Sequence, residues 1–190
     1  MRMHFEMAGK TDIGRQRIRN EDNFLLLEEF SLTAVADGMG GHVDGNIASK
    51  IAVDTLRDSY CSRYPEILMK YCNEKKELVK QQEKFLTEAV QEANRNIFAR
   101  NKGTFSLEGM GTTLVVLLLG EGYVLTACVG DSRIYLLQNS KLMQVTQDHS
   151  LVGELVRYNI IGEEDLIFLQ NKNIITRALG MSRSEERRVG

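Results

Sequence analysis

The sequence is poor in several residues that define whole protein classes. Its 190 residues include one proline, no tryptophan and three cysteines, Cys61, Cys72 and Cys128, which lie far apart without a C-x-x-C pair. This composition excludes collagen-like and mucin-like chains. An odd number of widely spaced cysteines argues against a disulfide framework and against a structural zinc site, and favours free thiols in a reducing cytosol.

The chain also has neither a large net charge nor a long apolar run. Lys and Arg number 24 against 26 Asp and Glu, a net charge of −2, so no overall positive field exists to hold nucleic acid or an anionic membrane. The longest aliphatic run, residues 114–119, is far shorter than a membrane span, and residues 1–10 contain no apolar secretory signal. We therefore expect a soluble cytoplasmic protein whose partners include neither nucleic acid nor membrane.

The apolar residues, 43% of the chain, are enough for one packed domain. In the first half, short apolar runs at 24–27 and 32–36 predict two strands joined by a tight turn. The glycines of 37–41 predict that the second strand ends where this segment begins. Helical spacing of apolar residues predicts a helix that starts near Asp44, with Asp44 or Asn46 as its N-cap.

The same spacing predicts a second helix over 76–100, after a polar connection around 65–75. Further along, residues 111–119, 123–129 and 133–137 predict three consecutive strands in an antiparallel meander. A short helix follows, capped by Asp148 or Ser150. Helices combined with antiparallel strands indicate an α+β layered architecture.

Three acidic groups lie beside glycine turns or strand ends. They are the pair Glu21 and Asp22, then Asp37, then Asp131 in a G-D-S-R hairpin. Mg²⁺ and Mn²⁺ prefer such oxygen ligands, although any one of these aspartates alone is more typical of a hydrogen-bonded turn. Together with Arg17, close to the first pair, they describe a metal-and-phosphate site more economically, but spacing does not prove that they converge.

Six sequence blocks in order carry a more specific signal. They are T-D-I-G-R-Q-R-I-R-N-E-D-N (11–23), V-A-D-G-M-G-G-H (35–42), G-M-G-T-T-L (109–114), V-G-D-S-R-I-Y (129–135), T-Q-D-H-S (146–150) and I-T-R-A-L-G (175–180). With these blocks the chain resembles the PPM family of metal-dependent protein serine/threonine phosphatases, the protein phosphatase 2C type, in its compact bacterial form. The resemblance gives a phosphatase domain over residues 1–181 and a charged tail over 182–190 that resembles no family block.

The resemblance implies an α/β/β/α sandwich of two antiparallel sheets flanked by helices, with two Mn²⁺ or Mg²⁺ ions at one end. In the family pattern Asp37 bridges the two metals and the carbonyl of Gly38 binds one of them. Glu21 and Asp22 support the site directly or through water, and Asp131 helps to hold a third, weaker metal.

The resemblance also implies the reaction. Arg17 takes the place of the arginine that grips the substrate phosphate, and a metal-activated water hydrolyses phosphoserine or phosphothreonine without a covalent enzyme intermediate. His42 is a candidate proton donor to the leaving alkoxide, but the histidine of eukaryotic relatives stands where this chain has Met39, and a loop histidine is more often structural. Thr112 and Thr113 are expected to shape the site rather than react.

The family pattern continues beyond residue 180 to an S-D-G-like turn and a D-N block, and this chain contains neither. We therefore expect a phosphatase domain that is incomplete at its C-terminus. The leading hypothesis is a monomeric phosphatase whose substrates are phosphoproteins made by bacterial serine/threonine kinases. The alternative is an inactive fragment, or a non-catalytic phosphoprotein-binding module of the same fold. A metal-dependent nuclease is a weaker third hypothesis, given the net charge of −2.

Overall fold

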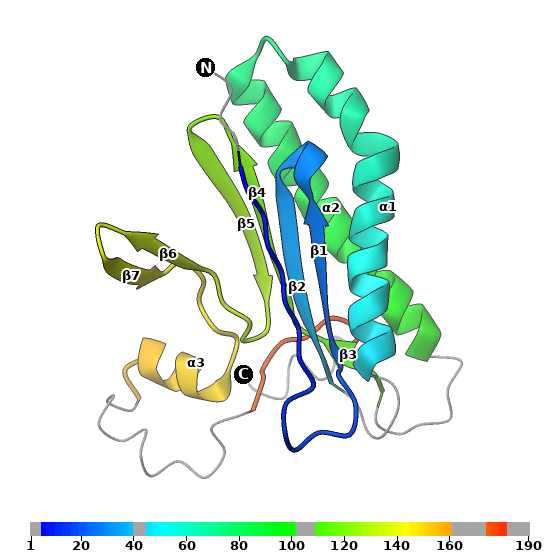
Figure 1. Ribbon diagram of the computed structural model, residues 1–190, viewed down its shortest axis with the longest axis vertical. Helices are drawn as coiled ribbons and strands as arrows, with labels where there is room; N and C mark the ends of the chain where they lie inside the picture. The colour runs from blue at the N-terminus through cyan, green and yellow to red at the C-terminus, as the bar shows by residue number, and fades with distance from the viewer. Residues whose placement is uncertain (1–4, 40–44, 102–108, 161–173, 182–190) are drawn as a thin grey trace.

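An antiparallel sheet lies at the centre of the computed structural model, which describes residues 5–39, 45–101, 109–160 and 174–181 (Figure 1). Its strand order is β1-β2-β4-β5, and a short strand, β3, pairs with the end of β2. The strands are β1 (Asp22–Leu27), β2 (Leu32–Met39), β3 (Gly111–Thr112), β4 (Leu114–Gly120) and β5 (Tyr123–Val129). The two predicted strand pairs are thus confirmed, except that the strand expected over 111–119 is divided at Thr113.

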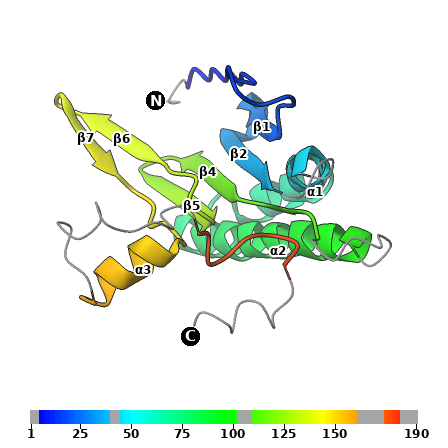
Figure 2. The same cartoon turned by 90° about the horizontal axis from the view of Figure 1, so that it is seen from below.

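Two long helices, α1 (Gly45–Tyr71) and α2 (Lys75–Asn101), pack on each other and cover one face of this sheet (Figures 1 and 2). Alternate strand residues face them and form the core with them, among them Leu25, Leu32, Ala34, Ala36, Leu114, Val116 and Leu118. The intervening residues point to the other face, where Phe24, Val35 and Val124 are 36, 46 and 52% exposed. The helices therefore leave one face of the sheet open.

The first helix is longer than the sequence predicts. The polar connection expected around 65–75 is wrong, because α1 continues through Pro65 and only a short turn separates it from α2. Tyr60 and Tyr64 are buried and pack on Phe85 of α2, with ring centroids 5.1 and 5.5 Å from the Phe85 ring. Burial of two such rings stabilises by about 4 kcal/mol, which exceeds the roughly 3 kcal/mol that an interior proline costs a helix.

The chain leaves the main sheet after β5. The remaining elements are the two-stranded sheet of β6 (Tyr135–Gln138) and β7 (Lys141–Gln144), and the helix α3 (Leu151–Arg157). The predicted meander is therefore wrong at β6: Gly130, at φ 100°, bonds through its N–H and C=O to His149 instead of to a neighbouring strand. The short helix is confirmed, and Ser150 Oγ caps it by accepting from the Gly153 N–H at 3.1 Å.

The α+β class with antiparallel sheets is confirmed by these elements. Over the described ranges the main sheet is layered against α1 and α2, and the β6–β7 hairpin extends to one side (Figures 1 and 2). None of the helices in these ranges is both long enough and apolar enough to cross a membrane.

Candidate metal and phosphate site

Two carboxylates face each other at the open end of the β1–β2 hairpin. Asp22 opens β1 and is the direct cross-strand partner of Asp37 on β2, so both side chains project from the same face of the sheet. The predicted break at Asp37 is wrong, because β2 continues to Met39 where its last residues pair with β3, Gly38 opposite Thr112. A strand, rather than a glycine turn, therefore holds Asp37 in place.

The environment of Asp37 disfavours its negative charge. Burial raises the pKa of its carboxyl from the ordinary 3.8 to about 6, and the charge of Asp22, a side-chain hydrogen bond to Asp22 and the charge of Asp131 act in the same direction. The positive charge of Arg17 acts against them and lowers the pKa. Asp22, Asp131 and Arg17 are thus all close enough to influence the charge of Asp37.

Asp22 has an oxygen that protein atoms leave unsatisfied. Its Oδ1 is buried and accepts no hydrogen bond from any described residue, although its backbone N–H donates to Asn20 Oδ1 at 3.0 Å. A buried, unpartnered carboxylate oxygen is costly, and it is satisfied when a cation binds beside it. A bound cation would therefore stabilise the Asp22–Asp37 pair.

Backbone packing brings Glu21 and Gly38 next to the first turn of α1. The Gly38 N–H donates to the Glu21 carbonyl at 3.1 Å, and a Cβ on Gly38 would overlap the carbonyl group of Gly45. A Cβ on Gly45 would in turn lie 2.9 Å from Glu21 Oε2, so this carboxylate sits against the start of the helix. Partial positive charge at a helix N-terminus favours a carboxylate there. Sequence reasoning missed Gly45, whose position just inside the helix start was the available signal.

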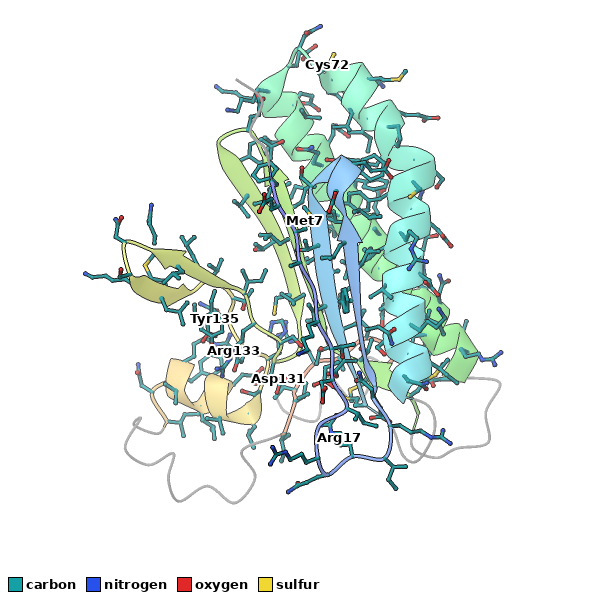
Figure 3. All side chains as sticks on the ribbon, in the orientation of Figure 1. Met7, Arg17, Cys72, Asp131, Arg133 and Tyr135 are labelled. Atoms are coloured by element: carbon teal, nitrogen blue, oxygen red, sulfur yellow. The ribbon has the colours of Figure 1, made fainter. Side chains whose placement is uncertain are left out.

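Arg17 lies in the loop that precedes β1. With Gln16, Arg19 and Glu21 it lines an open cavity of about 560 Å³. Its side chain is exposed, and the loop is shaped by the bond from the Gly14 N–H to Asp12 Oδ1 at 2.8 Å. Figure 3 shows Arg17 and Asp131 at the same end of the molecule. Arg17 is therefore free to bind an anion at the end of the sheet where the two aspartates meet.

Asp131 lies in the segment between β5 and β6, flanked by Gly130 and Ser132. His149 holds this segment: its N–H donates to the Gly130 carbonyl at 2.9 Å and its Nδ1 accepts from the Gly130 N–H at 3.3 Å. Arg133 braces the next turn through a forked ion pair with Asp148, at 2.5 to 3.0 Å, as expected of a loop brace. His42 lies outside the described residues.

The predicted metal ligands do not all converge. Across the described ranges, no three His, Cys, Asp or Glu side chains lie close enough together to hold a metal ion. The structure brings Asp22 and Asp37 together and puts Asp131 and Arg17 within electrostatic reach of Asp37. Sequence reasoning also missed Ser132, whose hydroxyl lies 2.7 Å from Thr113 Oγ1, although the G-D-S-R block contained it.

Comparison with known proteins assigns the family. A family model described as protein phosphatase 2C matches residues 9–177. The chain belongs to this family. Its members are protein serine/threonine phosphatases, which are metal-dependent hydrolases. The family resemblance and the phosphatase class predicted from the sequence are thus confirmed.

Curated members of the family match over most of the chain. The serine/threonine phosphatase stp of Listeria monocytogenes is 41% identical over 182 residues, which cover 94% of this chain and 68% of the relative. Protein phosphatase PhpP of Streptococcus pneumoniae is 33% identical, over 92% of this chain and 68% of the relative. The chain therefore spans about two thirds of the length of these relatives.

Solved structures agree with this assignment. A serine/threonine phosphatase from S. agalactiae superposes with a TM-score of 0.77 at 31% identity, covering 91% of this chain and 68% of that one. The Mycobacterium tuberculosis phosphatase PstP/Ppp gives 0.73 at 32% identity, covering 91% and 67%. The catalytic domain of a phosphatase named PstP, solved in complex with two manganese ions, gives 0.69 at 32% identity, covering 90% and 65%.

The residues present fit a hard divalent cation. Among the described residues, this end of the sheet offers the carboxylates of Asp22, Asp37 and Glu21, and Mg²⁺ and Mn²⁺ prefer such oxygen ligands. The unpartnered Oδ1 of Asp22 and the raised pKa of Asp37 both favour the binding of a cation at this end of the sheet. The site chemistry of this phosphatase 2C member is thus compatible with the metal dependence of its family.

Proposed function

We propose that the protein hydrolyses phosphoserine and phosphothreonine in proteins, with Mn²⁺ or Mg²⁺ as its cofactor. The observation that carries the proposal is the cross-strand pair Asp22–Asp37, with a buried unpartnered oxygen on one member and a raised pKa on the other. An exposed arginine, Arg17, lies near this pair. Metal-dependent hydrolysis of a phosphate ester needs carboxylates that bind cations and a group, here a guanidinium, that binds the phosphate.

Each residue of the site takes a separate role in this proposal. Asp37, the Gly38 carbonyl and the carboxylates of Glu21 and Asp22 would hold two divalent cations, and Asp131 would contribute to a third, weaker site. Bound divalent cations lower the pKa of water toward neutrality and neutralise phosphoryl oxygens. The carboxylates on β1 and β2 fix where those cations sit, because the hairpin ladder sets their separation.

Arg17 binds and orients the phosphate. A guanidinium presents two parallel N–H donors to phosphoryl oxygens, and this fork holds the group for in-line attack. The side chain is exposed on a loop before β1, so an incoming phosphorylated segment reaches it without displacing the core. His42 stays a candidate proton donor to the leaving alkoxide.

The setting of the reaction is also part of the proposal. We propose that the protein acts as a monomer in the cytoplasm on substrates of bacterial serine/threonine kinases. Its three cysteines are free, and Cys61 and Cys72 are exposed. Exposed free thiols support a reducing compartment.

A second candidate function is phosphoprotein binding without turnover. It is favoured by the same finding that leaves the metal site incomplete: the described part of the chain groups no three His, Cys, Asp or Glu side chains around one point. Arg17 would then bind phosphate without hydrolysing it.

Hydrolysis of a phosphothreonine peptide by the purified chain separates these functions. Phosphate release is measured with Mn²⁺ and with EDTA for the wild type, Asp37→Ala and Arg17→Ala. Asp58→Asn, a charge-neutralising change at an exposed position on α1, is the control. The proposal expects Mn²⁺-dependent turnover that Asp37→Ala abolishes and Arg17→Ala weakens. Peptide binding without turnover favours the binding module, and equal turnover in Asp37→Ala would refute the role of Asp37.

A further inference from the structure

A side-chain hydroxyl replaces a main-chain carbonyl in the ladder beside Asp37. The register between β2 and its neighbours places Thr113 directly opposite Asp37, between the pairs Val35–Val115 and Gly38–Thr112. The Thr113 N–H donates to the Asp37 carbonyl at 2.9 Å, as a ladder requires. The Asp37 N–H, however, donates to Thr113 Oγ1 at 3.0 Å rather than to the Thr113 carbonyl.

The displaced carbonyl has its own partner. The Thr112 hydroxyl lies 2.9 Å from the Thr113 carbonyl and 3.0 Å from the Asp37 carbonyl, and it donates its proton to these two acceptors. This exchange interrupts the regular ladder and divides the strand into β3 and β4. Both threonines are buried, Thr112 at 0% and Thr113 at 1% exposure, so water does not substitute for their hydroxyls.

The Thr113 side chain also touches both neighbours of Asp131. Its Oγ1 lies 2.7 Å from Ser132 Oγ. Its methyl group lies against Gly130, where an added Cβ would be only 2.6 Å from Thr113 Cγ2. Oγ1 accepts from the Asp37 N–H and shares a second hydrogen bond with Ser132 Oγ, in which either hydroxyl can donate. One buried side chain thus connects the backbone of Asp37 to both residues that flank Asp131.

We propose that Thr113 is a positioning residue that fixes Asp131 relative to Asp37 for cation binding. This inference rests on the proposed function, because that function assigns both aspartates to adjacent cation sites. The hydroxyl is the essential group, because it hydrogen-bonds to both segments and valine of the same shape bonds to neither. Asp37 lies on β2 and Asp131 follows β5, two strands that do not pair directly, and Thr113 contacts both segments.

The test compares Mn²⁺ affinity among matched variants by calorimetric titration. Thr113→Val removes the hydroxyl and keeps the shape, Thr113→Ser keeps the hydroxyl, and Ser132→Ala removes its partner. Thr55→Val is the control, because the Thr55 hydroxyl is also buried, accepts one bond from Asn96 at 3.1 Å and lies on α1 away from the site. Loss of one buried hydrogen bond corresponds to about a fivefold to tenfold weaker Mn²⁺ affinity.

We expect Thr113→Val and Ser132→Ala to weaken Mn²⁺ binding by about that factor, and the double variant to weaken it little more than either alone. Thr113→Ser should stay within about twofold of the wild type. In urea unfolding of the metal-free proteins, Thr113→Val should lose more stability than Thr55→Val, because its hydroxyl has two partners and that of Thr55 has one. Thr55→Val should bind Mn²⁺ normally. If Thr113→Val does not fold, Ser132→Ala and Thr113→Ser still decide the question.

Two results would overturn the inference. Unchanged Mn²⁺ affinity in Thr113→Val and Ser132→Ala would leave Thr113 as a purely structural residue of the ladder. Equal weakening in Thr113→Ser and Thr113→Val would assign the effect to the methyl group and not to the hydroxyl. A wild type that binds no Mn²⁺ and hydrolyses no phosphopeptide would instead refute the proposed function, and the inference with it.

Discussion

Replacing Asp37 by asparagine should make the metal-free protein more stable while destroying its cation site. The wild-type carboxyl is partly buried and faces Asp22 across the hairpin, so its ionised form is disfavoured in the folded state. Asparagine keeps the shape and polarity of the side chain but carries no charge. The folded state of Asp37→Asn is therefore relieved of the repulsion, while the unfolded state is nearly unaffected.

The size of the effect follows from the pKa of Asp37, about 6 in the folded protein against an ordinary 3.8. At about 1.4 kcal/mol for each pH unit of difference, the ionised carboxyl costs the fold at most about 3 kcal/mol. Asp37 is only partly buried, and solvent screening reduces this to about 1–2 kcal/mol. Because the pKa is raised in the folded state, wild-type stability falls as pH rises from about 4 to about 6 and is constant above.

The assay is urea unfolding in EDTA at pH 4 and at pH 7, with and without added Mn²⁺ at pH 7. At pH 7 the free energy of unfolding of Asp37→Asn should exceed that of the wild type by about 1–2 kcal/mol. At pH 4 the two values should be nearly equal. Mn²⁺ should stabilise the wild type and leave Asp37→Asn unchanged. A stability difference of the same size at both pH values, or a less stable variant at pH 7, would refute the reasoning.

Four further substitutions test other contacts. Gly38→Ala should destabilise by about 3 kcal/mol or more in urea unfolding, because its Cβ would overlap the Gly45 carbonyl group, and an unchanged midpoint would contradict the packing. Tyr60→Phe should be neutral or stabilising by up to about 1 kcal/mol, since the buried Tyr60 hydroxyl has no partner, whereas Tyr64→Phe should cost about 1 kcal/mol because Gln82 Nε2 donates to that hydroxyl. Arg133→Lys should lower the thermal midpoint by only a few degrees, equivalent to about 1 kcal/mol, because the lost fork to Asp148 is half exposed; a loss above about 3 kcal/mol would show that this ion pair is worth more than its exposure implies.

The local part of the fold could be predicted from the sequence. Apolar spacing gave both helices, and short β-branched runs gave the strands that build the hairpin carrying Asp22 and Asp37. The start of α3 was also predictable, because Ser150 caps it through its own side chain. These features depend on contacts between residues close in the chain, which periodicity and capping describe well.

The rest depends on contacts between distant segments. The sequence predicted that β2 ends before its glycines, yet it continues because β3, more than 70 residues later, supplies a pairing partner. A polar connection was predicted around 65–75, yet α1 continues through Pro65, because Tyr60 and Tyr64 pack on Phe85 of α2. The bond from the Asp37 N–H to the Thr113 hydroxyl spans 76 residues, and no local pattern indicates it. The roles of the predicted ligands stay predictions, and the contacts that support Asp37 and Asp131 could not be predicted from local sequence.

The β1–β2 hairpin also bears on the order in which the molecule folds. Asp22 and Asp37 are brought together by a single tight reversal at Ser31, a contact of low sequence separation that closes early. Thr113 and Asp131 join them only when β4, already in a hairpin with β5, forms its long-range pairing with β2. In the nascent hairpin the two carboxylates therefore repel each other before the contacts from Thr113 have formed. A cation present during synthesis would relieve that repulsion at the first step, making it a folding partner as well as a cofactor.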